Sequence, residues 1–272
     1  MSELIQYIRA HPTIATYSAL YSSAWEDNAL LNNIITLTCS NIGLLSIPDM
    51  PNIQKIDCSK NNITQLSLMP NLLNLNCSHN QLTVIPLYDH LLWLDCSSNL
   101  LNELPNILSL TTLYCQDNQL MLLPLFSNLT GLYCYNNKLT TIVASSKWKV
   151  LYCQNNKITS LSGSISNLLI LNCENNLLTS LPEVCPVQQI NCAGNCLLIL
   201  PAMPNATEIL CEMNEIKSIT YAPCVIKFNC AYNKLTTLPL LPLVQWLDCS
   251  NNHIHTLPTM PYIQNLNCIN NG

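Results

Sequence analysis

The chain has 272 residues, of which 49% are hydrophobic and only 9% are charged, against about 25% charged residues in an average protein. This much apolar material excludes intrinsic disorder. A net charge of -5, with Arg9 as the one arginine, provides no basic surface for phosphates, so we do not expect nucleic acid as a partner. The sequence has neither a continuous apolar stretch of spanning length nor a secretory leader, so we expect no membrane insertion.

The first 33 residues are expected to form a helical cap. Apolar residues recur there at helical spacing, interrupted by the pair His11-Pro12. The apolar positions are Leu4, Ile5, Ile8, Ile14, Tyr17, Leu20, Tyr21, Ala24 and Leu30. This pattern predicts two short helices that cover the first turn of the structure that follows, because the end of a repeat array otherwise exposes its core.

Residues 34–272 are a repeat array of about 13 units, with no separate C-terminal domain expected. Thirteen cysteines mark the period, which is 19 residues except for one interval of 20 between Cys153 and Cys173. We call them the ladder cysteines: Cys39, Cys58, Cys77, Cys96, Cys115, Cys134, Cys153, Cys173, Cys192, Cys211, Cys230, Cys249 and Cys268. An apolar residue stands two positions before each of them, and an asparagine stands three positions after all but the first, where Ile42 replaces it.

The unit predicts one short strand per turn. In the segment Leu-x-Cys the leucine and the cysteine point inward and the residue between them points outward. A turn of 19 residues is too short for a full helix after the strand, so its proline-rich return path is expected to be extended. The asparagine amide is expected to satisfy backbone groups at the turn.

Written as L-x-C-x-x-N-x-L-x-x-L, the unit resembles the leucine-rich-repeat family, whose pattern is L-x-x-L-x-L-x-x-N-x-L. The short period is similar to that of bacterial effector-type repeats, and Cys- and Asn-rich arrays are also found in large DNA viruses. The resemblance implies a curved horseshoe, mostly β within the α/β-type repeat class, with a concave parallel sheet and extended convex segments. It also implies an N-terminal helical pair. The ubiquitin-ligase domain of some bacterial effectors has no counterpart in this sequence.

The ladder cysteines are expected to be buried thiols. Neighbouring rungs keep Cβ atoms near the strand spacing, which is beyond disulfide range, and free cysteine packs as a small hydrophobe. A metal-binding ladder is the alternative, but the sequence lacks a C-x-x-C pair, so we expect no metal and no cofactor. Cys185, Cys196 and Cys224 lie off the ladder and are expected to be the more reactive thiols.

Outward aromatic residues mark the expected binding surface. Directly before three successive ladder cysteines stand Tyr114, Tyr133 and Tyr152, joined by Tyr135 and, one strand earlier, Trp93. Tyrosine suits recognition hot spots, although stacked tyrosines could instead stabilise neighbouring strands. Both interpretations remain open from the sequence alone.

A charged rim is the second expected feature of this surface. Glutamates make one end acidic and two lysines lie nearer the middle, an asymmetry that could orient a partner. The rim residues are Glu174, Glu208, Glu212, Glu215, Lys138 and Lys157.

A catalytic site is not expected. Ser78, His79 and Asp95 should all face outward on adjoining turns, but no nucleophile turn or oxyanion motif accompanies them and an open face does not exclude water. The expected function is therefore that of a non-enzymatic scaffold that binds a protein partner on its concave face.

The alternative is a structural part of a larger assembly, a viral particle or a homo-oligomer, joined through an uncapped C-terminal edge and a surface of low charge. Unpaired cysteines further indicate an intracellular reducing compartment, which would be the cytoplasm, including that of a host cell, or a virion.

Overall fold

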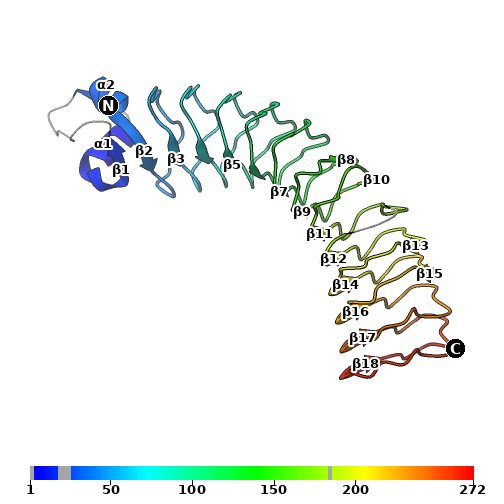
Figure 1. Cartoon of the computed structure of the whole chain (residues 1–272). Coiled ribbons are helices and arrows are strands. Elements are labelled where there is room, and N and C mark those ends of the chain that lie inside the picture. The colour runs from blue at the N-terminus through cyan, green and yellow to red at the C-terminus, as the bar shows by residue number, and fades with distance from the viewer. Residues whose placement is uncertain (1–2, 18–25, 183–185) are drawn as a thin grey trace. The chain divides into compact units, whose positions relative to one another are not determined.

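The computed structural model describes residues 3–17, 26–182 and 186–272. The chain divides into two compact units, Met1–Leu129 (unit 1) and Thr130–Gly272 (unit 2), and each is built from turns of one kind. Every turn places one short strand in a main sheet and returns through an extended segment on the opposite side (Figure 1). None of the helices in the described residues has the length and apolar character needed to cross a membrane.

The N-terminal end of unit 1 begins with helix α1 (Glu3–Ala10), which buries Leu4, Ile5 and Ile8. The helix ends before the predicted break, and a 3-10 turn (Pro12–Ile14) follows it. Helix α2 (Asp27–Asn33) leads directly into the first repeat, and an ion pair of 3.0 Å joins Arg9 of α1 to Asp27 of α2.

One part of the predicted second helix is wrong. Residues Ala15–Tyr17 form strand β1, which pairs antiparallel with β2 and places Ala15 opposite Leu37. Pairing with an open sheet edge satisfies backbone groups that a helix would satisfy internally, and here the tertiary context overrides the local helical spacing. Leu20, Tyr21 and Ala24, which belong to the same prediction, lie outside the described residues.

Apart from β1, the strands of the main sheet are parallel and in register with the repeat. In unit 1, Leu37 pairs with Ile56 and Ile56 with Leu75, so equivalent positions of successive turns lie side by side. The strands of unit 1 are β2 (Ile34–Thr38), β3 (Lys55–Asp57), β4 (Asn74–Asn76), β5 (Trp93–Asp95) and β6 (Thr112–Tyr114). Those of unit 2 are β7 (Gly131–Tyr133), β9 (Val150–Tyr152), β11 (Ile170–Asn172), β12 (Gln189–Asn191), β14 (Glu208–Leu210), β16 (Lys227–Asn229), β17 (Trp246–Asp248) and β18 (Asn265–Asn267).

The return segments are extended, as predicted, and in four turns of unit 2 they form hydrogen-bonded strands. Strand β8 (Thr141–Ala144) pairs in parallel with β10 (Ser160–Gly163), and β13 (Ile199–Leu200) pairs with β15 (Ser218–Ile219). Gly163 has a φ of 83°, and a Cβ there would collide with the carbonyl oxygen of Ala144. Only glycine fits at this close approach of two backbones.

A column of asparagines connects each turn to the one before it. Asn80 donates to the carbonyl oxygens of Cys58 (3.0 Å) and Cys77 (3.0 Å), and its Oδ1 accepts from the backbone N–H of Ile63 (3.0 Å). The same pattern recurs at Asn195, which bonds Cys173, Cys192 and the N–H of Leu178. The prediction that the asparagine amide satisfies turn backbone is confirmed.

The residue two positions after each ladder cysteine adopts a left-handed backbone, which the sequence pattern did not reveal. The backbone φ lies between 52° and 62° at this position in every turn, and Asn and Asp tolerate it better than most other residues. The residues are Asn41, Lys60, His79, Ser98, Asp117, Asn136, Asn155, Asn175, Gly194, Met213, Tyr232, Asn251 and Asn270.

The ladder cysteines fill the core behind the sheet. From Cys39 to Cys249 they are buried free thiols, at most 1% exposed, as expected. Burial raises the pKa of Cys39 to about 12, with Asp57 adding to the shift, and it raises the pKa of Cys77 well above the ordinary value. Cys268 is the exception because it is exposed on the last strand, so the expectation that all thirteen are buried is wrong there.

Candidate functional site

The outer face of the main sheet consists of three columns of side chains. They come from the residues three before, one before and one after each ladder cysteine. The first two columns are half-exposed on most strands and the residue between them is buried, whereas the third column contains half-buried residues as well as buried serines and alanines. We call this surface the sheet face. The predicted aromatic residues lie on it, as do Glu174, Glu208 and Glu212. Glu215, Lys138 and Lys157 stand four residues after a ladder cysteine, outside the three columns.

Aspartate and asparagine side chains of the middle column fix the ends of several strands. Asp95 Oδ1 accepts from the hydroxyl (2.6 Å) and the N–H (3.0 Å) of Ser97, two residues later. Asn76 holds Ser78 in the same way, and Ser78 is only 6% exposed. Ser78 lies on the sheet face as expected, but its hydroxyl is buried and donates to Asn76 within its own turn.

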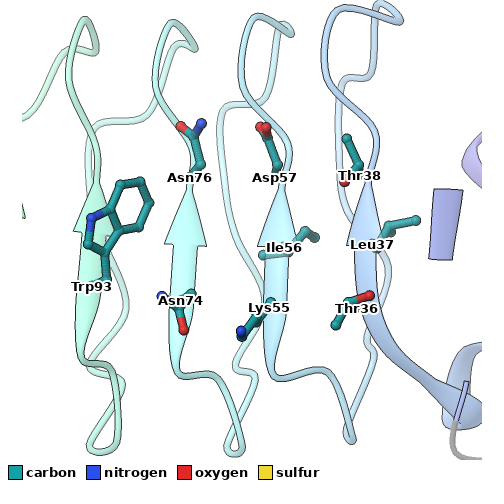
Figure 2. A pocket seen from close by; sticks show the side chains of 9 residues that line it. All are labelled: Thr36, Leu37, Thr38, Lys55, Ile56, Asp57, Asn74, Asn76 and Trp93. Carbon is teal, nitrogen blue, oxygen red and sulfur yellow. The ribbon is translucent and has the colours of Figure 1, made fainter. Parts of the chain in front are cut away.

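In unit 1 the sheet face carries an aromatic pair beside a depression. The rings of Trp93 and Tyr114 lie 5.7 Å apart at 53°, in a tilted arrangement. Next to Trp93 the face is hollowed by about 510 Å³ over β2 to β5. Figure 2 shows Trp93 at one side of this depression, with the polar side chains of Lys55, Asp57 and Asn76 on the neighbouring strands.

In unit 2 the sheet face begins with a second aromatic pair. The rings of Tyr133 and Tyr152 lie 5.2 Å apart and 8° from parallel, so they are stacked. Tyr135 is half-buried in the column after the ladder cysteine of the same turn. The structure thus brings four of the five predicted aromatic residues together, as Trp93 with Tyr114 in unit 1 and Tyr133 with Tyr152 in unit 2.

The predicted rim residues have different environments. Glu174 accepts a hydrogen bond of 2.9 Å from the amide of Asn191, and Glu208 forms an ion pair of 2.7 Å with Lys227. Glu215 pairs with Lys234 away from the sheet face. Lys138 and Lys157 are exposed.

Glu212 has the most unusual environment of the predicted residues. It stands in the column after the ladder cysteine, and its neighbours in that column, Ala193 and Ala231, are buried and too small to offer it a polar partner. Its Oε2 atom is buried and has no hydrogen-bond partner among the described residues. Burial raises the pKa of this carboxyl group, and the nearby carboxylates of Glu174 and Asp248 raise it further, while a backbone hydrogen bond and Lys227 oppose the shift.

A second depression of about 190 Å³ separates the tyrosine pair from Glu212. Tyr152, Asn172, Asn191, Glu208 and Leu210 are among the residues that line it. Sequence reasoning did not assign Lys227 or Trp246 to the surface, although the Lys227 ammonium lies 6.0 Å from the centre of the Trp246 ring. The signal that could have found them is the column three residues before the ladder cysteine, which contains both.

Chemically, the sheet face offers aromatic rings, amides and carboxylates on an open surface. In the described part of the chain, no three His, Cys, Asp or Glu side chains are grouped so that they could hold a metal ion. Aromatic side chains of this kind are enriched at protein interfaces in general.

Comparison with known proteins identifies the fold. No family model matches the sequence, and no curated protein matches it. Among solved structures, YopM, a leucine-rich effector protein from Yersinia pestis, is 26% identical with a TM-score of 0.70, and the match covers 87% of this chain and 83% of that one. A leucine-rich-repeat protein of Leptospira interrogans is 25% identical with a TM-score of 0.75, over 92% of this chain and 76% of that one.

A third similar structure is also described as containing a cysteine ladder. The functional domain of InlJ from Listeria monocytogenes has a TM-score of 0.68 at 20% identity, over 85% of this chain and 62% of that one. Together with the repeat geometry above, these matches show that the chain has the fold of a leucine-rich-repeat solenoid, similar to bacterial effector-type repeat proteins.

Proposed function

We propose that the protein is a non-enzymatic recognition module that binds a protein partner on its sheet face. The observation that carries the proposal is the pair of stacked tyrosines, Tyr133 and Tyr152, on an open surface of unit 2. Solenoids commonly bind partners on the extended surface that their stacked strands create. Tyrosines there offer a large, fairly rigid contact area with a polar tip, which is typical of binding hot spots.

The aromatic pair of unit 1 supports the same proposal. Trp93 and Tyr114 are both half-buried, so each keeps part of its ring accessible beside the depression of Figure 2. Trp and Tyr are among the residues most enriched at interface hot spots. We therefore include Trp93, Tyr114 and Tyr135 in the proposed contact surface, with the rim residues setting the orientation of the partner.

The test compares tyrosines on the sheet face with tyrosines elsewhere. A variant carrying Tyr114→Ser, Tyr133→Ser, Tyr135→Ser and Tyr152→Ser should lose a partner captured from the native source, with affinity reduced by tenfold or more, since hot-spot truncations cost about 2 kcal/mol or more each. The matched control is Tyr221→Ser with Tyr262→Ser, because both residues are exposed off the sheet face. Equal capture by both variants, each still folded by circular dichroism, would remove the sheet face from the function.

Self-assembly is the second candidate function, and the last strand favours it. On and beside β18, Leu266 is 44% exposed, Ile269 is 63% exposed and Cys268 is exposed as well. A second copy or another component of an assembly would bury these apolar groups. Light scattering tests this candidate: a species larger than a monomer is expected, and Ile269→Asp should dissociate it.

A reducing compartment completes the proposal, because the buried ladder cysteines need no disulfide to fill the core. Mass spectrometry of the protein from its native source should then find free thiols along the ladder. Ladder disulfides in that material would contradict this compartment.

A further inference from the structure

We infer that the sheet face of unit 2 binds an extended basic segment of the partner, with an arginine side chain packed over Leu210 and bonded to Glu212. The inference rests on the proposed function and names the chemistry of the partner at that surface. The residues that carry it lie on or directly after β9, β11, β14, β16 and β17.

Charge is the first argument. The three outward columns from β11 to β17 contain four carboxylates and one ammonium group. The acidic residues are Glu174, Glu208, Glu212 and Asp248, and the basic residue is Lys227. Lys227 pairs with Glu208, and the other three carboxylates form no ion pair among the described residues. A partner with positive charge complements this surface.

The hydrogen-bond state of each carboxylate is the second argument. Glu174 accepts from Asn191, and Asp248 accepts from Ser250 through Oδ1 and from Asn267 through Oδ2. Glu212 differs because its buried Oε2 has no partner in the described chain. An unsatisfied buried acceptor costs free energy, and the cost is greater when the group is charged.

Gln154 provides an internal comparison for Glu212. It occupies the same column, and its Oε1 is likewise buried without a partner. An amide oxygen is neutral, so the missing donor costs much less there than at a carboxylate. A guanidinium group supplies the donor and the charge together, and it forms two parallel bonds to a carboxylate.

Shape is the third argument. The depression lined by Tyr152, Asn191, Glu208 and Leu210 begins beside the stacked tyrosines. Leu210 lies between Glu208 and Glu212 on the outer face of one strand, so it can support the aliphatic stem of an arginine whose head reaches the carboxylate. Ala193 and Ala231, on either side of Glu212 in its column, are small and apolar, so they offer no side-chain donor that competes with the guanidinium group.

The spacing of the acidic residues favours an extended peptide. Glu174, Glu212 and Asp248 belong to the turns of β11, β14 and β17. The turn of β12 lies between the first two, and the turn of β16 lies between the last two. Two strand spacings are about 9.6 Å, and three residues of polyproline II cover about 9.3 Å. A segment with basic residues three positions apart therefore matches these turns.

The test uses three labelled peptides with a proline-rich background. The first has three arginines placed three residues apart, and in the other two glutamine or glutamate replaces every arginine. Fluorescence anisotropy with the full chain should show the arginine peptide binding at least about tenfold more tightly than the glutamine peptide, from two or more partly exposed ion pairs. Equal affinities for the arginine and glutamine peptides would overturn the inference.

Variants separate a specific bond from general charge attraction. Glu212→Gln keeps the shape of the side chain and should weaken the arginine peptide roughly fivefold. Glu103→Gln, at an exposed residue of unit 1, changes the net charge by the same amount and should leave binding unchanged. Equal weakening by both variants would show that only net charge attracts the peptide, and the inference would fall.

Failure of this inference is distinguishable from failure of the proposed function. If the tyrosine variant loses its protein partner while the arginine peptide shows no preference, the sheet face binds a partner of other chemistry. If arginine binding depends on Glu212 while the tyrosine variant keeps its partner, the basic-segment site stands and the tyrosine surface does not.

Discussion

The rings of Tyr133 and Tyr152 stack 5.2 Å apart on neighbouring strands of unit 2. Such contacts between adjacent strands stabilise a sheet, so the pair has a structural effect whether or not it binds a partner. A double-mutant cycle with Tyr133→Ala and Tyr152→Ala should give a coupling free energy of about 0.5–1.5 kcal/mol, measured by urea unfolding. A coupling near zero would mean that the stacking adds nothing to the stability of the isolated protein.

Removing one asparagine of the column should destabilise the fold strongly. Asn195→Ala leaves the N–H of Leu178 and the carbonyl oxygen of Cys173 without their side-chain partner in a buried site. We expect the free energy of unfolding to fall by about 2–4 kcal/mol. Asn205→Ala, at an exposed position, is the matched control and should change it by less than about 0.5 kcal/mol. Similar losses for the two variants would contradict a structural role of the column.

Maleimide labelling should separate the ladder cysteines from the accessible ones. In the native protein we expect reaction at Cys196, Cys224 and Cys268, which are exposed or half-exposed. Cys249, whose pKa burial raises to about 11, and the earlier ladder thiols should react only after denaturation, because burial limits both access and thiolate formation. Mass spectrometry of the labelled peptides identifies the sites, and labelling of Cys77 or Cys96 in native protein would contradict the buried ladder. Cys185, the other off-ladder thiol expected to react, lies outside the described residues.

The ladder should tolerate apolar replacement better than polar replacement. Cys134 is fully buried, so Cys134→Ser places a hydroxyl group in the core and should lower the free energy of unfolding by about 1–3 kcal/mol. Cys134→Val should cost less, because free cysteine already packs as a small hydrophobe. Urea titrations of both variants measure the difference, and a valine variant less stable than the serine variant would refute this account.

Glu212 should make stability depend on pH. Its folded pKa is raised above the ordinary value of 4.5, so the folded protein holds this proton more tightly than the unfolded chain does. The resulting stabilisation is present below the unfolded pKa and is lost as the pH rises through the folded pKa. Glu212→Gln should therefore raise the Tm relative to the wild type at neutral pH, and the difference should disappear in acid. A Tm difference that grows as the pH falls would have the wrong sign for this mechanism.

The sequence by itself determined the repeat, because every turn has the same types of residue at the positions that form its strand, its core and its bend. The period of the cysteines, the inward leucine two residues earlier and the asparagine three residues later fix strand, core and turn in each unit, and equivalent residues such as Leu37 and Ile56 then pair in register. The roles of the cysteine and asparagine columns were predictable for the same reason. The cysteines pack against equivalent residues of neighbouring turns, and the asparagines form hydrogen bonds to the backbone of their own turn and of the preceding one.

Only the tertiary structure decided the features that depend on particular neighbours. Ala15–Tyr17 is a strand because β2 offers it an edge, Ser78 is buried because Asn76 holds it, and Cys268 is exposed because it lies on the last strand. The environment of Glu212 differs from that of Glu215, because Glu212 lies between two small alanines and one of its carboxylate oxygens is buried without a hydrogen-bond donor. A periodic sequence repeats the positions of side chains, but the desolvation and hydrogen bonding of each one depend on the residues in the adjacent turns, which differ along the array.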